Sequence, residues 1–153
     1  MTTTQTATFG AGCFWSAEAA FRRVPGVVDT AVGYADTENP VANDTGTGVS
    51  ANTEVVQVQY DPKRVSFEQL LDAFWDIEDP TDPHQSEEYR SVILFSTPEQ
   101  AAEAQASKER LERSGRFHRP IVTEIRPAPT FYRARESDQR YLERHGSLFC
   151  ATA

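Results

Sequence analysis

The sequence predicts an α+β domain of two layers, with helices packed on one face of a β-sheet. Short segments of β-branched or alternating apolar residues indicate strands, and longer segments with apolar residues at helical spacing indicate helices. Turn residues separate these segments. Since 153 residues can bury a proper core, we expect one domain over 1–153, in which 136–153 form a C-terminal tail.

The first strand and the first helix meet at a cysteine. Residues 7–10 indicate a short strand that leads through Gly12 to Cys13. Apolar residues recur at helical spacing from Phe14 onward, and Pro25-Gly26 ends this predicted helix.

The middle of the chain adds two strands, a loop and a second helix. Residues 27–34 and 54–60 are rich in β-branched residues and alternate partly or fully, which indicates strands. Between them, 36–52 is rich in Asp, Asn, Thr and Gly, and loops of this length in compact domains are commonly functional. The stretch 66–75 opens with the Ser and Gln spacing of a capping box, which predicts a helix.

The next part repeats the pattern of loop, strand and helix. A second polar loop over 79–88 precedes a strand at 91–95. Thr97-Pro98 supplies an N-cap and a first helical turn for an Ala-rich helix that Gly115 ends. Residues 120–125 indicate a last core strand.

From Phe131 we expect a tail with a short helical stretch over 139–144. The predicted order is therefore β-α-β-β-α-β, followed by α-β and the tail. This order is typical of the ferredoxin-like (split βαβ) fold with additions.

Composition and charge exclude several function classes. The net charge of −8 argues against nucleic acid or an anionic membrane as a partner, and no window approaches the roughly 20 apolar residues of a membrane span. A polar, Thr-rich start without a secretory pattern predicts a cytoplasmic protein. The three histidines are scattered and neither cysteine has a second ligand at zinc spacing, so we expect no metal and no other cofactor.

Cys13 is the first candidate for chemistry. A thiol at a helix N-terminus lies against unpaired N–H groups and the positive end of the helix dipole, which favour the nucleophilic thiolate. The alternative is a small buried apolar residue, as most free cysteines are. Small residues over 10–12 favour the reactive interpretation because they allow close approach. Phe14 and Trp15 place two aromatic faces beside the sulfur.

Cys150 is the only other cysteine, and it lies near the end of the chain, where termini are commonly mobile. It is either an incidental thiol or the partner that a sulfenic acid at Cys13 needs to form a disulfide. Two cysteines in a chain of this kind favour redox use over a disulfide scaffold.

Three further candidate side chains lie at the ends of predicted strands. Glu54 opens an apolar strand, where a solvated strand-end charge is the simpler interpretation. If it faces the pocket beside Cys13 instead, desolvation would raise its pKa and make it a proton donor. Tyr34 and Tyr89 lie at strand–loop junctions, which by themselves indicate amphipathic edge residues.

Many ordered segments together resemble one known family. The motif Gly12-Cys13-Phe14-Trp15, followed by Glu18, is the most specific of them. The further matching segments are 21–27, 32–35, 53–56, 60–62, 74–75, 79–81, 89–91, 121–125 and 131–132. Over nearly the whole chain they resemble the A-type methionine sulfoxide reductases, and the chain is identified as a member of that family.

The resemblance implies a reaction and a role for each residue. Cys13 would attack the sulfur of methionine (S)-sulfoxide, free or in a peptide. Glu54 would protonate the departing oxygen, and Tyr34 and Tyr89 would hydrogen-bond it, because such an oxygen leaves only when protonated.

The resemblance also implies how the substrate is held and how the enzyme is recycled. Phe14 and Trp15 would contact the S-methyl group in an apolar slot. Cys150 would resolve the sulfenic acid of Cys13 as a disulfide, and thioredoxin or another dithiol would reduce it.

The sequence departs from the family pattern around the pocket. The unusual residues are Ser16, Asp36-Thr37, Asn52, 137–139, and His84 at the place of a family aspartate. These changes motivate an alternative, the same reaction on a different small alkyl or aryl methyl sulfoxide. A further alternative is a thiol redox switch of Cys13 and Cys150 without turnover.

Overall fold

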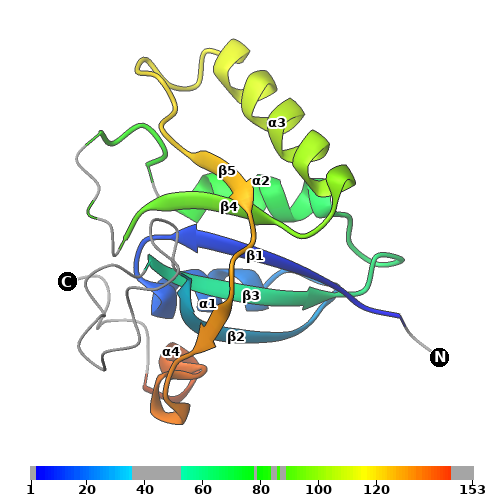
Figure 1. Cartoon of the computed structure of the whole chain (residues 1–153), viewed down its shortest axis with the longest axis vertical. Helices are drawn as coiled ribbons and strands as arrows, with labels where there is room; N and C mark the ends of the chain where they lie inside the picture. The colour runs from blue at the N-terminus through cyan, green and yellow to red at the C-terminus, as the bar shows by residue number, and fades with distance from the viewer. Residues whose placement is uncertain (1–2, 36–52, 78, 84–85, 87–88, 146–153) are drawn as a thin grey trace.

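The computed structural model describes residues 3–35, 53–77, 79–83, 86 and 89–145 (Figure 1). Its strands are β1 (Gln5–Ala11), β2 (Val27–Ala35), β3 (Thr53–Tyr60), β4 (Ser91–Phe95), β5 (Glu124–Pro127) and β6 (Phe131–Arg133). Its helices are α1 (Phe14–Arg22), α2 (Phe67–Ile77), α3 (Pro98–Arg113), the 3-10 helix η2 (Glu136–Asp138) and α4 (Tyr141–His145).

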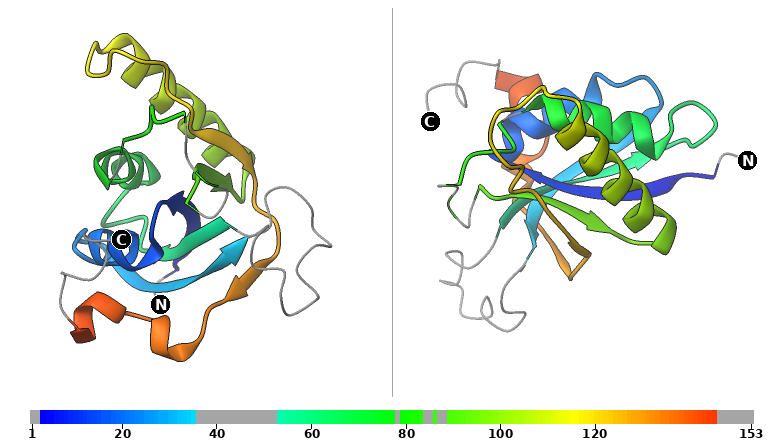
Figure 2. Two further views of the ribbon diagram at one scale, coloured as in Figure 1. Left: turned by 90° about the vertical axis from the view of Figure 1, so that its left-hand side faces the viewer. Right: turned by 90° about the horizontal axis from the view of Figure 1, so that it is seen from above.

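The six strands form one sheet in the order β5-β4-β1-β3-β2-β6. Neighbouring strands are antiparallel, except that β4 and β5 are parallel. Figure 2 shows that the sheet is strongly twisted and that α1 and α2 lie on the same face. The predicted α+β class is confirmed, whereas the ferredoxin-like assignment stays an interpretation, because β5 and β6 extend the sheet at both edges.

The core lies between the sheet and the two helices α1 and α2. Phe9 of β1 is its centre: its ring stacks on Phe21 of α1 at 4.8 Å and on Phe67 and Phe74 of α2 at 6.0 and 5.4 Å. Because alternate strand residues face opposite sides, the other face carries a second, smaller cluster. It consists of Ala35, Val55, Val92 and Leu94, with Phe131 packed against them.

Most predicted elements begin and end within a few residues of their expected positions. The predicted capping box is confirmed: Ser66 Oγ accepts from the Gln69 N–H at 3.0 Å, and Gln69 Oε1 accepts from the Ser66 N–H at 2.9 Å. The predicted N-cap is confirmed too, since Thr97 Oγ1 accepts from the Gln100 N–H at 3.1 Å.

Two predictions near the C-terminal end were wrong in detail. The strand expected at 120–125 begins only at Glu124, since the Val122 N–H donates to Pro80 O at 2.8 Å instead of to a strand. Strand β6 was not predicted. It pairs with the edge of β2, where Gly33 permits its close approach: a Cβ there would overlap the Tyr132 carbonyl oxygen.

The described part of the chain contains no helix long and apolar enough to cross a membrane. The loop expected over 36–52 lies outside the described residues, as do His84 and Cys150.

Candidate active site

Cys13 lies at the junction of β1 and α1. Gly12 has φ +77°, a conformation that favours glycine, and it turns the chain out of β1. Cys13 then occupies the N-cap, with φ −62° and ψ 124°, and its carbonyl accepts the Ala17 N–H at 3.1 Å. Its side chain is partly exposed and makes no capping hydrogen bond, and Cys13 is disulfide-bonded. The expected place at the mouth of a helix is confirmed.

The carboxyl group of Glu54 supplies the cap that the Cys13 side chain does not. Its Oε1 accepts the Phe14 N–H at 3.0 Å, and this N–H belongs to the first turn of α1, where backbone donors lack partners within the helix. Glu54 is only 8% exposed. The simpler interpretation, a solvated strand-end charge, was therefore wrong: β3 begins underneath the helix terminus.

Tyr34 lies beside Glu54 across the β2–β3 ladder. The two residues are direct partners in the register, so their side chains point to the same face of the sheet. The Tyr34 ring also lies 5.6 Å from the Phe14 ring, tilted by 55°. The structure thus brings Cys13, Phe14, Glu54 and Tyr34 together at one end of the sheet.

Tyr132 of β6 lies next to Tyr34 in the sheet, and the sequence indicated no role for it. It pairs directly with Tyr34 and is 40% exposed. Its only signal in the sequence was its place in a segment that resembles the family.

Tyr89 lies just before β4, and its backbone N–H donates to Ser86 O at 3.2 Å. The ladder between β1 and β4 pairs Ala11 with Ser91, so the chain before β4 runs beside the turn that carries Cys13. The side chain is 38% exposed. Whether its hydroxyl converges with Glu54 on one substrate atom stays a prediction.

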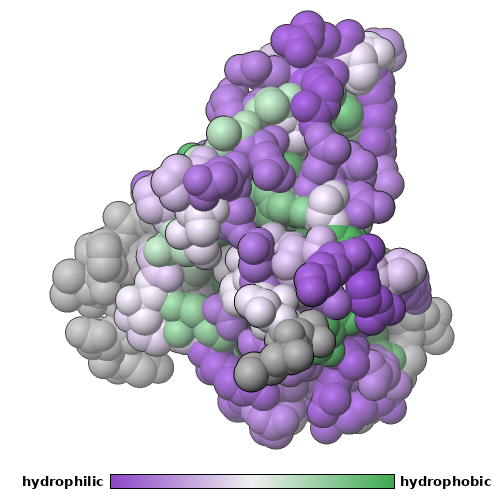
Figure 3. All heavy atoms as spheres, turned by 90° about the vertical axis from the view of Figure 1, so that its right-hand side faces the viewer, coloured by the Kyte–Doolittle hydropathy of each residue, from purple (hydrophilic) through white to green (hydrophobic). Residues whose placement is uncertain are grey.

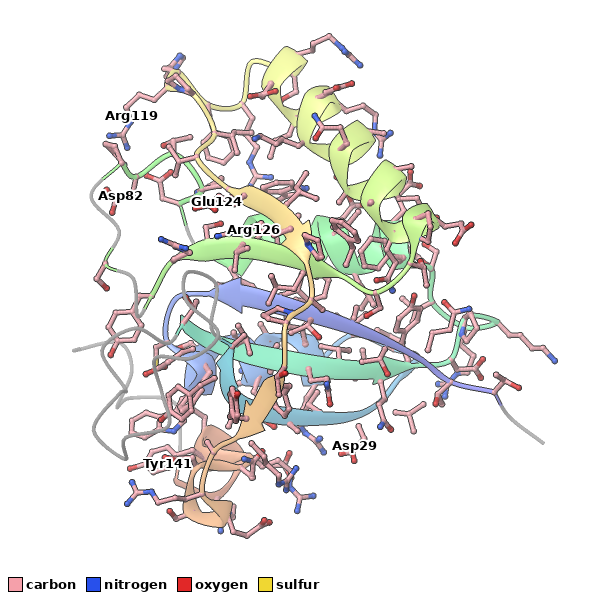
Figure 4. All side chains as sticks on the ribbon, in the orientation of Figure 1. Asp29, Asp82, Arg119, Glu124, Arg126 and Tyr141 are labelled. Carbon is pink, nitrogen blue, oxygen red and sulfur yellow. The ribbon has the colours of Figure 1, made fainter. Side chains whose placement is uncertain are left out.

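Trp15 is held by the C-terminal segment, which the sequence did not indicate. Its ring stacks on Tyr141 of α4 with centroids 3.8 Å apart and planes 8° from parallel. Figure 4 labels Tyr141 on α4. Its indole N–H donates to Asp138 Oδ1 at 3.3 Å. Both partners lie more than a hundred residues along the chain, and Asp138 belongs to the segment in which the sequence departs from the family pattern.

Three other features describe the surroundings of the site. A cavity of about 480 Å³ lies between α1 and α4, and its lining includes Trp15, Ser16 and Arg140. Within the described ranges, no group of three or more His, Cys, Asp or Glu side chains could bind a metal ion. The face on the right-hand side of Figure 1 is mostly hydrophilic, with small apolar areas (Figure 3).

Sequence comparison finds close relatives of the chain. A model of the family described as peptide methionine sulfoxide reductase matches residues 5–153. A peptide methionine sulfoxide reductase MsrA from Methanoculleus marisnigri is 56% identical in an alignment 153 positions long. The alignment covers 95% of this chain and 93% of the relative. An MsrA from Methanothermobacter thermautotrophicus is 51% identical, with 94% of this chain and 89% of the relative covered.

Solved structures resemble the fold as well. Reduced Mxr1 from Saccharomyces cerevisiae superposes with a TM-score of 0.78 at 31% identity, covering 92% of this chain and 85% of Mxr1. Mxr1 in complex with Trx2 superposes with a TM-score of 0.67 at 29% identity, covering 88% of this chain and 84% of Mxr1.

Proposed function

The chain belongs to the peptide methionine sulfoxide reductase family, and from this premise we propose that Cys13 is the nucleophile of the reaction. The chain is an oxidoreductase that reduces methionine sulfoxide with thiols as the reductant. The single observation that supports its residue roles best is the buried Glu54 carboxyl on the Phe14 N–H, next to Cys13.

The first step is attack of the Cys13 thiolate on the sulfoxide sulfur. The N-terminus of α1 favours the thiolate through its backbone dipoles. The attack joins Cys13 Sγ to the sulfoxide sulfur, and the S–O bond breaks as the oxygen takes two protons and leaves as water. Water then adds to Cys13 Sγ as the bond between the two sulfurs breaks, and the net change is one methionine and one Cys13 sulfenic acid. The sulfoxide sulfur gains two electrons and the Cys13 sulfur loses two.

Glu54 is the general acid of this step in our proposal. An oxygen leaving sulfur needs a proton, and a carboxyl that is largely removed from water can deliver it beside the nucleophile. Tyr34 is the second donor, because it is the cross-strand neighbour of Glu54 and faces the same side. Tyr89 is the third, from the chain that runs beside the Cys13 turn.

Phe14 and Trp15 hold the S-methyl group of the (S)-sulfoxide. Phe14 is nearly buried against Tyr34, and Trp15 is partly exposed beside Cys13. Removal of a methyl-sized group from water contributes about 0.8 kcal/mol to binding. Contact with the two rings therefore stabilises the bound S-methyl group.

Recycling needs a second thiol and an outside reductant. Cys150 is the other cysteine of the chain, and its thiol would convert the Cys13 sulfenic acid into a disulfide and water. A yeast relative of this fold forms a complex with Trx2, which supports a thioredoxin-type dithiol as the reductant here.

The function is tested by thiol-dependent turnover. We expect reduction of methionine (S)-sulfoxide, free and in a peptide, and none of the (R) epimer. Cys13→Ser should abolish it. Faster turnover of aryl methyl sulfoxides than of methionine (S)-sulfoxide would favour the altered substrate. Disulfide formation with peroxide but no sulfoxide turnover would favour the redox switch.

A further inference from the structure

A buried carboxyl group joins α1 to the turn that leads into α4. Glu18 of α1 is 1% exposed. Its Oε1 accepts the backbone N–H of Arg140 at 2.7 Å, and its Oε2 accepts the hydroxyl of Thr30 on β2 at 2.6 Å. Glu18 therefore connects the helix, the sheet and the C-terminal segment, and none of the roles proposed above uses it.

The turn that Glu18 holds has an unfavourable backbone conformation. Arg140 has φ +52°, and it is the single non-glycine residue with positive φ in the described part of the chain. Such a conformation persists when the surroundings hold it in place. The preceding residue is held too: the Gln139 side chain accepts the Val32 N–H at 2.8 Å and donates to Val32 O at 2.9 Å.

The residues on either side of this turn both contact Trp15. Asp138 accepts the indole N–H, and Tyr141 stacks on the ring. Trp15 and Glu18 are three residues apart on α1, so they lie on the same side of the helix. A displacement of the turn at Arg140 would therefore release both contacts to Trp15 at once.

We propose that Glu18 is a positioning residue for Trp15: by holding the turn at Arg140, it fixes Asp138 and Tyr141 and through them the plane of the indole. The inference rests on the proposed function, in which Trp15 contacts the S-methyl group. A contact that binds substrate and transition state alike acts on KM more than on the rate at saturation. Loss of this support should raise KM.

The sharpest test changes Arg140 in two opposite ways. Arg140→Pro removes the N–H that Glu18 accepts and forbids positive φ. Gln139 has φ −71° and ψ 130°, a conformation that a following proline permits, so the change does not strain the residue before the turn. Arg140→Gly keeps the N–H and adopts positive φ without strain.

We expect Arg140→Pro to raise KM for methionine (S)-sulfoxide about tenfold, with the single-turnover rate at saturation within about threefold of the unaltered protein. Arg140→Gly should leave KM within about twofold. Fluorescence gives a second readout, since Trp15 and Trp75 are the two tryptophans and Trp75 is 3% exposed. Iodide should quench a larger fraction of the emission in Arg140→Pro than in Arg140→Gly.

Three changes separate positioning from simple structural support. Glu18→Ala should raise KM as Arg140→Pro does. Glu18→Gln keeps an acceptor for the Arg140 N–H, so its KM should be close to that of the unaltered protein. Thr30→Val removes the other partner of Glu18 and should lower thermal stability without raising KM. Glu143→Ala is the matched control, because this carboxylate also bridges α1 and α4, through Arg22, but is exposed.

The outcomes distinguish this inference from the proposed function. An unaltered protein that does not reduce methionine sulfoxide would remove the proposed function. If the unaltered protein turns over and Arg140→Pro has an unchanged KM, only the positioning role is wrong. An equal rise of KM in Thr30→Val would also overturn it, since Glu18 would then act through general stability. If Glu18→Ala does not fold, the comparison of Arg140→Pro with Arg140→Gly still tests the positioning role.

Discussion

The carboxyl of Glu54 is held between the start of β3 and the first turn of α1. Its bond to the Phe14 N–H links residues 40 positions apart in the sequence. A strand-end glutamate is normally solvated, so no local pattern around it indicates burial. The sequence identified this residue through its resemblance to a family, and its environment came from the way that β3 lies under the helix.

Glu54→Gln tests the acid directly. The amide oxygen can still accept the Phe14 N–H, so the fold should persist, but the amide cannot deliver a proton. We expect the single-turnover rate to fall by about 10²–10⁴-fold, as removal of a general acid does. Glu68→Gln, at an exposed carboxylate of α2, is the control. A rate within threefold of the unaltered protein would show that another group supplies the proton.

Strand β6 is a short element whose position depends on one glycine. It pairs with β2 through three residue pairs, and Gly33 is directly opposite Arg133. Since a Cβ at Gly33 would overlap the Tyr132 carbonyl oxygen, Gly33→Ala must move β6 or the edge of β2.

We expect Gly33→Ala to lower the free energy of unfolding by about 1–3 kcal/mol, a typical cost of overpacking, when measured by urea denaturation. Gly115→Ala is a useful comparison, because open space surrounds that glycine and only its φ of +79° opposes a side chain. A smaller loss at Gly33 than at Gly115 would contradict the assignment of β6 to the edge of β2.

The turn at the start of the second polar loop depends on the charge of Asp79. Its Oδ1 accepts the Thr81 hydroxyl at 2.6 Å and the Thr81 N–H at 2.9 Å. These hydrogen bonds, more than the neighbouring Arg119, hold the pKa of Asp79 below its usual value. A lowered pKa in the folded state means that the carboxylate stabilises the fold above its unfolded pKa, and that this contribution is lost as the pH falls.

Asp79→Asn should therefore lower stability at neutral pH, and its difference from the unaltered protein should shrink as the pH falls below about 4. Urea denaturation at neutral and acid pH measures this difference. A stability difference that widens towards acid pH would contradict this role, because the hydrogen bonds from Thr81 stabilise the charged carboxylate.

Local patterns predicted the elements between β1 and α3 because each signal is contained within a few residues. The capping box at Ser66 and the N-cap at Thr97 are examples. The C-terminal segment was predictable only as a tail. Its structure depends on hydrogen bonds such as that from the Arg140 N–H to Glu18, which joins residues 122 apart. Contacts of this kind produce no periodic pattern in the sequence.

For the same reason the site was only partly predictable. Cys13 was recognisable from the small residues before it and the helix after it. The contact between Phe14 and Tyr34 and the burial of Glu54 arise from the pairing of β2 with β3. The cover over Trp15 arises from the return of the chain to α1 after β6.

Taken as a whole, the molecule should work as a cycle with two thiols. Cys150→Ser should still reduce about one methionine sulfoxide per protein without added reductant, because Cys13 alone receives the oxygen. Multiple turnover with thioredoxin should fall at least about tenfold, because the disulfide that thioredoxin attacks cannot form. The measurement is methionine released per protein, first without and then with thioredoxin. Unchanged thioredoxin-dependent turnover would show that Cys150 has no part in recycling.

The role of Cys13 as the nucleophile can be tested by following its sulfur in a single turnover. Cys150→Ser protein is reduced, freed of reductant, mixed with one equivalent of methionine (S)-sulfoxide and examined by peptide mass spectrometry. If Cys13 is the nucleophile, one methionine forms per protein, and one oxygen atom is added at Cys13 as a sulfenic acid that dimedone traps. Methionine formed while Cys13 stays unmodified, or an oxygen found on another residue, would contradict this role.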